Sequence, residues 1–143
     1  VMVSDSCKKR FGKIMLEQME LLEQVKIAPN IFSMTLKGQM VSQMQAGQFL
    51  HIRVPDDSKL LRRPISIAEI DRDNLTCRII YRIEGGGTAI FSQLLVGSFL
   101  DVMGPQGNGF DLSPVRAGDH ALIIGGIFLA ISIFCVKVRC TKA

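Results

Sequence analysis

The sequence predicts an all-β fold, a small antiparallel barrel of about six strands with one short helix. Two observations support this prediction. Short segments with strand-like apolar patterns, several of them strictly alternating, recur between residues 15 and 112. Clusters of turn-forming residues separate them at short intervals, at residues 29–30, 56–58, 71–74 and 104–109.

The first predicted element, residues 15–25, is ambiguous by pattern alone, because its apolar positions suit one face of a helix as well as a strand. Thr88 begins an apolar run of roughly two helical turns, which predicts the short helix. Alternation, β-branched content or a backbone held extended by proline predicts five further strands, at residues 31–36, 50–54, around 63–66, 75–84 and 99–103.

The tetrapeptide Arg63-Pro64-Ile65-Ser66 contains residue types that a flavin site needs. Arg63 can pair with a phosphate through two hydrogen bonds, and Pro64 fixes the local backbone. The Ser66 hydroxyl can donate to the oxidised flavin N5 and accept from the reduced N5–H. Taken alone, however, so short a motif more often marks an edge strand with a solvated arginine pair.

A second group of candidates follows the strand predicted at residues 75–84. Three glycines, Gly85 to Gly87, lead into Thr88 at the predicted helix start. Free backbone N–H groups at a helix N-terminus suit a pyrophosphate. A glycine-rich turn with a threonine N-cap explains the same residues without any ligand.

Four blocks of the sequence, taken in order, resemble the FAD-binding domain of the ferredoxin reductase superfamily. The blocks are A-G-Q-F-L-H-I-R-V-P at 46–55, L-L-R-R-P-I-S-I at 60–67, I-Y-R-I-E-G-G-G-T at 80–88 and D-V-M-G-P-Q-G-N-G-F at 101–110. The resemblance runs from about residue 15 to 124. Within the superfamily the chain more closely resembles the electron-transfer subunits of class B dihydroorotate dehydrogenase, which share the isoleucine found at Ile65.

The resemblance implies a six-stranded Greek-key barrel over residues 15–114 that binds FAD. It also implies a subunit that passes electrons from an FMN-containing dihydroorotate dehydrogenase catalytic subunit, its partner in a heterotetramer, to NAD in pyrimidine biosynthesis. The chemistry then belongs to the flavin, and no residue is expected to be catalytic. The implied FAD contacts are Arg63, Pro64, Ile65, Ser66, Ile80, Tyr81, Arg82, Gly87 and Thr88.

The sequence departs from the family just after Gly126. Members of the family continue into a glycine-rich turn that opens a nicotinamide-binding domain, and the four cysteines that ligate their 2Fe-2S cluster follow later. Cys135 and Cys140 have the spacing of two such ligands, but without the other two we expect no cluster. We expect residues 115–143 to be a truncated or aberrant remnant of the α/β NAD-binding domain. The chain alone is then expected to oxidise NADH poorly.

The net charge of +4 does not indicate a nucleic-acid partner, because the excess basic residues lie near the two ends. Residues 14–136 carry ten basic and 12 acidic residues. Residues 1–14 are expected to be a disordered basic extension. The four cysteines follow no secreted-scaffold spacing, which favours a reduced, cytoplasmic setting, and no metal site is expected.

An uncharged apolar stretch at residues 121–136 leaves a second interpretation open. It falls slightly below the roughly 17 to 25 residues of a transmembrane helix, so membrane attachment is not expected. The alternative function is a non-enzymatic remnant or small binding module, attached to a membrane through this stretch. Bound FAD would distinguish the two functions.

Overall fold

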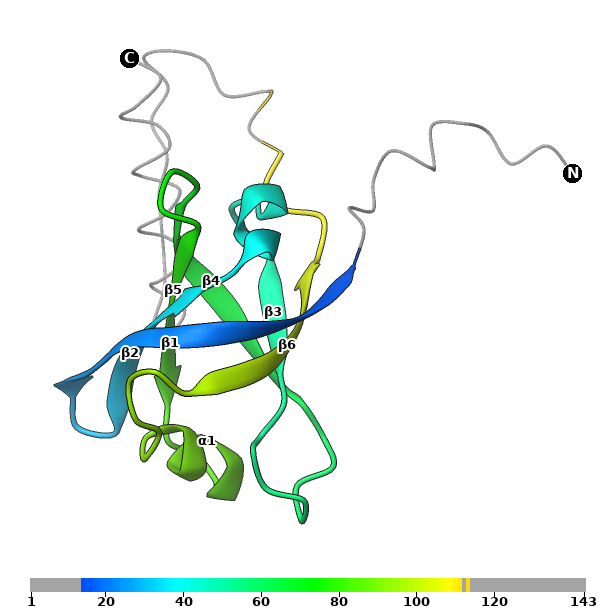
Figure 1. Ribbon diagram of the computed structural model, residues 1–143. Helices are drawn as coiled ribbons and strands as arrows, with labels where there is room; N and C mark the ends of the chain where they lie inside the picture. Colours follow the sequence, from blue (N-terminus) through cyan, green and yellow to red (C-terminus); the bar gives the residue numbers. More distant parts are fainter. Residues whose placement is uncertain (1–13, 112, 114–143) are drawn as a thin grey trace, which may run out of the picture.

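The computed structural model describes residues 14–111 and residue 113, which form a closed barrel of six antiparallel strands (Figure 1). Around the barrel the strands follow the order β1-β2-β5-β4-β3-β6. Strands β3, β4 and β5 are consecutive neighbours and β2 lies beside β5, which is a Greek-key arrangement. The strands are β1 (Met15–Ala28), β2 (Ile31–Lys37), β3 (Phe49–Ile52), β4 (Arg63–Asp71), β5 (Thr76–Arg82) and β6 (Phe99–Gln106).

One short α-helix, α1 (Gly86–Phe91), connects β5 to β6. The predicted all-β barrel with one short helix is therefore confirmed. The helix begins two residues earlier than the sequence predicts, because Gly85 and not Thr88 is its N-cap residue. The Thr88 hydroxyl lies inside the first turn, where it accepts a hydrogen bond from the Glu84 N–H and donates one to the Gly85 carbonyl.

The ambiguous first element is a strand. β1 pairs with β2 on one side and with β6 on the other, and the strand period buries Met19 and Leu21 completely. Leu22 and Val25, which would lie on the buried face of a helix, are 37% and 45% exposed. The helical spacing in the sequence arises because this strand also carries apolar residues on its outer face.

A 3₁₀ helix over Gln39–Gln43 was not predicted. Its first N–H groups are satisfied by the carboxylate of Glu17, which accepts hydrogen bonds from Gln39 N (2.6 Å) and Met40 N (2.8 Å). Since Glu17 lies on β1, more than 20 residues earlier, no local sequence signal marks this helix.

Apolar side chains from all six strands fill the interior of the barrel. Burying one such side chain contributes roughly 1.5 to 3 kcal/mol. Methionines supply an unusual share of this core, and their unbranched side chains suit irregular gaps. The fully buried methionines are Met19, Met34, Met40 and Met44.

Several sequence predictions concern residues 1–13, 112 and 114–143, which lie outside the described residues. They are the basic extension, the remnant domain at 115–143, the apolar stretch at 121–136, and the interpretations of Cys7, Cys135 and Cys140. The domain boundaries at 14/15 and 114/115 stay predictions. Within residues 14–111, no helix has the length and apolar character needed to cross a membrane.

Candidate functional site

The candidate site lies where β4 and β5 separate. The two strands pair from Ile67 opposite Ile79 to Asp71 opposite Thr76. Toward the other end of the barrel, residues 63–66 of β4 pair only with β3, and residues 80–82 of β5 pair only with β2. The barrel wall therefore contains a gap with a free strand edge on each side.

Pro64 suits this position because proline has no N–H to donate to a ladder. It lies on the part of β4 that has one strand neighbour instead of two. The edge-strand part of the alternative interpretation thus fits residues 63–66 locally, whereas its solvated arginine pair does not, because Arg62 forms an ion pair with Asp101. The edge position does not exclude a ligand, because the free edge faces a cavity.

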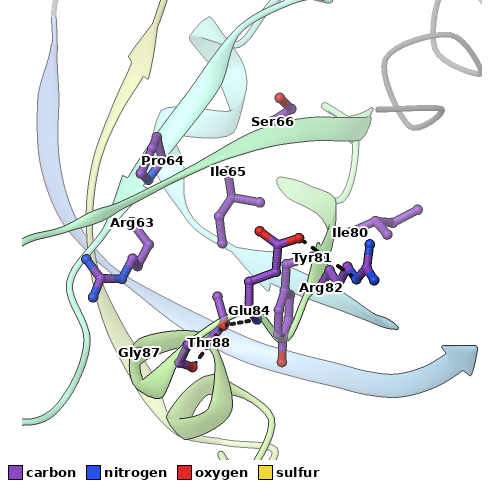
Figure 2. Close-up of a pocket in the computed structure, with 11 residues that line it drawn as sticks. Arg63, Pro64, Ile65, Ser66, Ile80, Tyr81, Arg82, Glu84, Gly87 and Thr88 are labelled. Carbon is purple, nitrogen blue, oxygen red and sulfur yellow. Dashed lines mark hydrogen bonds and ion pairs between the residues drawn. The ribbon is translucent and has the colours of Figure 1, made fainter. Parts of the chain in front are cut away.

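A cavity of about 440 Å³ occupies the gap (Figure 2). All nine residues that the sequence nominated for flavin contact line it, although they come from β4, β5 and α1. Figure 2 shows Arg63 and Ser66 at opposite ends of the β4 segment, with Thr88 and Gly87 near the arginine end. The lining residues are Arg63, Pro64, Ile65, Ser66, Ile80, Tyr81, Arg82, Glu84, Gly85, Gly87 and Thr88.

The Arg63 guanidinium packs against the first turn of α1. A Cβ atom on Gly87 would lie 2.6 Å from Arg63 Nε and 3.1 Å from Arg63 Nη2, so only glycine permits this approach. Arg63 Nη1 donates a hydrogen bond to the Leu61 carbonyl at 3.4 Å. Among the described residues no carboxylate forms an ion pair with Arg63. Its positive charge is therefore available to an anionic ligand.

Tyr81 forms part of the cavity wall and is 4% exposed. Its ring stacks on Phe32, with 5.8 Å between ring centroids, and meets Phe91 edge-on at 6.0 Å. Its hydroxyl donates a hydrogen bond to Gln24 Oε1 at 3.2 Å. Burial raises the pKa of the Tyr81 hydroxyl, so this group stays a neutral hydrogen-bond donor.

Gln24 connects the cavity wall to α1, a role that no sequence pattern predicted. Its Nε2 donates to the carbonyls of Phe91 (3.1 Å) and Leu94 (3.4 Å), at the end of α1 and beyond it. Gln24 lies 67 residues before Phe91, so only the folded structure brings the two together. The amide thereby fixes the helix whose first turn packs on Arg63.

Two lining residues, Glu84 and Gly85, are not among the nine implied contacts, although Gly85 belongs to the glycine turn that the sequence offered as a phosphate site. Glu84 ends the strand predicted at residues 75–84 and Gly85 follows it, both inside the block I-Y-R-I-E-G-G-G-T, so their contiguity with Arg82 and Gly87 was the available signal. The Glu84 carboxylate lies 3.9 Å from Arg82 Nε (Figure 2). Both side chains are more than half exposed, so this ion pair contributes little to stability.

The residues fit the FAD that their sequence pattern predicts. A pyrophosphate needs a fixed cation without a competing anion, and Arg63 beside Gly87 supplies one. A flat ring needs apolar walls with a hydroxyl nearby, and Ile65, Tyr81 and Ser66 provide these. No group of three or more histidine, cysteine, aspartate or glutamate side chains within the described part of the chain could hold a metal ion.

Comparison with known proteins agrees with an FAD site. Residues 18–110 match the family described as the oxidoreductase FAD-binding domain. The electron transfer subunit of dihydroorotate dehydrogenase B (NAD(+)) from Streptococcus mutans is 66% identical over 113 residues, which cover 79% of this chain and 44% of that protein. The subunit of the same name from Enterococcus faecalis is 50% identical over 111 residues, covering 77% of this chain and 42% of that protein. The chain thus spans less than half the length of these curated relatives.

Solved structures share the fold at lower identity. The cytochrome P450 reductase of Amycolatopsis aligns with a TM-score of 0.76 at 22% identity, over 90% of this chain and 40% of that chain. Ferredoxin-NADP+ reductase from Plasmodium falciparum aligns with a TM-score of 0.70 at 12% identity, over 85% of this chain and 52% of that chain. At these identities the likeness concerns the fold alone, and it agrees with the predicted ferredoxin reductase type of barrel.

Proposed function

The chain belongs to the family of oxidoreductase FAD-binding domains, and we propose that the cavity between β4 and β5 holds the FAD. The observation that supports this proposal most directly is the Arg63 guanidinium, which packs on Gly87 at the rim of the cavity without a carboxylate partner among the described residues. This guanidinium is partly exposed and no described carboxylate neutralises it, so it can pair with a phosphate through charge-assisted hydrogen bonds.

Two parts of FAD then have a counterpart in the cavity, the pyrophosphate and the isoalloxazine ring. We place the pyrophosphate at Arg63 and the backbone amides of Gly87 and Thr88, and the isoalloxazine ring near Ser66. Pro64, Ile65, Ile80, Tyr81 and Arg82 complete the walls. When bound, the flavin supplies the chemistry of hydride and single-electron transfer. The protein residues bind and orient it, and in the wall Tyr81 packs edge-on against Phe91.

We propose further that the chain acts in the electron-transfer subunit of a dihydroorotate dehydrogenase B. In that role electrons pass from an FMN-containing catalytic subunit through the FAD to NAD, in pyrimidine biosynthesis. The support is the identity of 50% to 66% with subunits of that name, over 111 to 113 residues of this chain. A cytoplasmic location stays a prediction from the cysteine pattern.

The proposed FAD site is tested by replacing the pyrophosphate-binding cation. Wild-type protein and Arg63→Ala are titrated with FAD, and the quenching of flavin fluorescence gives the dissociation constant. Losing a charge-assisted hydrogen bond costs about 1.5 to 3 kcal/mol, so the variant should bind FAD roughly ten- to a hundredfold more weakly.

The matched control is Arg78→Ala. Arg78 pairs with Glu69 at 2.9 Å and does not line the cavity, so its loss should leave the FAD affinity unchanged. An unchanged dissociation constant for Arg63→Ala would contradict the assignment of Arg63. A wild-type protein that binds no FAD would contradict the proposed function as a whole and favour a non-enzymatic binding module.

A further inference from the structure

The segment from Arg53 to Arg62 joins β3 to β4 and returns to the barrel immediately before Arg63. Asp101 of β6 contacts both ends of this segment. The Asp101 carbonyl accepts hydrogen bonds from Arg53 N at 2.9 Å and from Arg62 Nη1 at 3.0 Å. The Asp101 carboxylate accepts a third from Arg62 Nη2 at 2.9 Å. Asp101 thus holds the two ends of the segment, Arg53 and Arg62, together. We call this junction the neck of the segment.

The Arg62–Asp101 ion pair differs from the other ion pairs of the described residues. Its side chains are only 23% and 18% exposed. The Arg78–Glu69 pair has the same 2.9 Å length but is more exposed, at 36% and 33%. The pairs Arg53–Asp57 and Arg82–Glu84 are longer, at 3.7 and 3.9 Å, and their side chains are more than half exposed. Exposed pairs contribute little, whereas a desolvated pair holds its two groups in one geometry.

The Asp101 carboxylate is also only half satisfied. Its Oδ1 atom is buried and has no hydrogen-bond partner among the described residues, so Arg62 alone compensates for the desolvation of the charge. A buried pair of this kind adds little net stability compared with apolar packing. A role in fixing position explains the arrangement better than a role in stability.

The position of Arg63 depends on that of Arg62, because the two residues are adjacent in the chain. The Arg63 guanidinium donates to the carbonyl of Leu61, inside the segment that Asp101 closes. On its other side the guanidinium lies against Gly87, where a Cβ atom would come within 2.6 Å of Arg63 Nε. A small shift of the neck would therefore move the Leu61 carbonyl and take the guanidinium away from its place at the cavity.

We propose that Asp101 is a positioning residue for the FAD site, which acts through Arg62 to hold Arg63 where the pyrophosphate binds. Asp101 does not line the β4–β5 cavity. This inference rests on the proposed function, since it assigns Asp101 a role in binding the same FAD.

The test is a double-mutant cycle on FAD affinity between Asp101→Asn and Arg63→Ala. Asparagine keeps the backbone carbonyl and its hydrogen bond from Arg53 N but removes the charge that fixes Arg62. Residues that are linked by a hydrogen-bond network or a shared backbone shift show coupling energies, so Asp101→Asn alone should weaken FAD binding roughly three- to tenfold. In the Arg63→Ala background the same substitution should cause no further loss, because the residue that it positions is gone.

The matched control is Glu69→Gln, which removes the charge from an ion pair of the same 2.9 Å length outside the cavity. It should leave the FAD affinity unchanged in both backgrounds. Thermal unfolding without FAD checks that every variant is folded. If Asp101→Asn does not fold, Arg62→Lys keeps the charge but loses the two-pronged contact, and the same cycle applies to it.

The outcomes separate the two proposals. No FAD binding by the wild-type protein contradicts the proposed function. FAD binding that Arg63→Ala weakens and Asp101→Asn leaves unchanged contradicts only the role of Asp101. Losses that multiply in the double variant also contradict it, because Asp101 would then act independently of Arg63.

Discussion

At the scale of single residues, the site depends on how closely atoms approach. The Arg63 guanidinium lies where a side chain on Gly87 would be. Gly87 has no left-handed backbone, so the requirement for glycine comes from space and not from φ. A substitution at Gly87 should therefore change FAD binding without lowering the stability of the fold.

Gly87→Ala should weaken FAD binding by up to about tenfold, because the new Cβ displaces the guanidinium. Alanine is up to about 1 kcal/mol more favourable than glycine in a helix, so stability without FAD should hold or rise. FAD titration and thermal unfolding measure the two effects. Gly86→Ala is the control, since its Cβ would meet only the flexible end of Lys59 at 3.3 Å.

Cys77 should link stability to alkaline pH. Burial, and to a smaller extent the charge of Glu17, raises the pKa of its thiol from 9.0 to about 12. Because the folded pKa is the higher one, the stabilisation is complete below pH 9 and declines as the pH rises toward 12.

Between about pH 8 and pH 10, the contribution of Cys77 to the free energy of unfolding should fall by about 1 kcal/mol. Urea unfolding of the wild type and of Cys77→Ala at both pH values measures it. The variant should lose that part of the pH dependence, while the part from the buried Tyr81 remains. Equal pH dependence in both proteins would rule out the Cys77 contribution.

At the scale of elements, the sequence predicted the strands and site residues that are marked by a local pattern. Alternation predicted the strands, and the resemblance nominated nine residues that all line one cavity. The elements and side-chain roles that the sequence did not predict depend on residues far away in the chain. Glu17 caps a 3₁₀ helix more than 20 residues away, and Gln24 anchors a helix 67 residues away. No local window of sequence contains such pairs.

Gln24→Ala should loosen α1. The carbonyls of Phe91 and Leu94 lose a donor and the Tyr81 hydroxyl loses an acceptor, so unfolding should become easier by roughly 1 to 3 kcal/mol. Hydrogen exchange should also speed up in α1 more than in β2. The exposed Gln18 on the same strand gives the control, Gln18→Ala, with little effect on either measurement. Equal effects of the two substitutions would show that Gln24 does not anchor the helix.

At the scale of the whole molecule, the proposed cofactor joins parts of the chain that the barrel leaves apart. The cavity is lined by the start of β4, the end of β5 and the first turn of α1. A ligand that contacts all three in the folded state and none in the unfolded chain stabilises the fold by mass action.

FAD at about a hundred times its dissociation constant should therefore stabilise the protein by about 2.7 kcal/mol, which raises the melting temperature by several degrees. Differential scanning fluorimetry with an external dye, or circular dichroism, measures the shift. Arg63→Ala at the same FAD concentration should show a smaller shift. Bound FAD without any shift would mean that the ligand does not select the folded barrel.

The ladder between β4 and β5 stops at the Ile67–Ile79 pair, and this has a consequence beyond binding. Each side of the gap presents backbone groups with no strand opposite, and exposed sheet edges are where foreign strands add and aggregation begins. A flavin that lies in the gap would shield both edges at once. The supply of flavin during synthesis of the chain would then govern how much of the protein escapes aggregation.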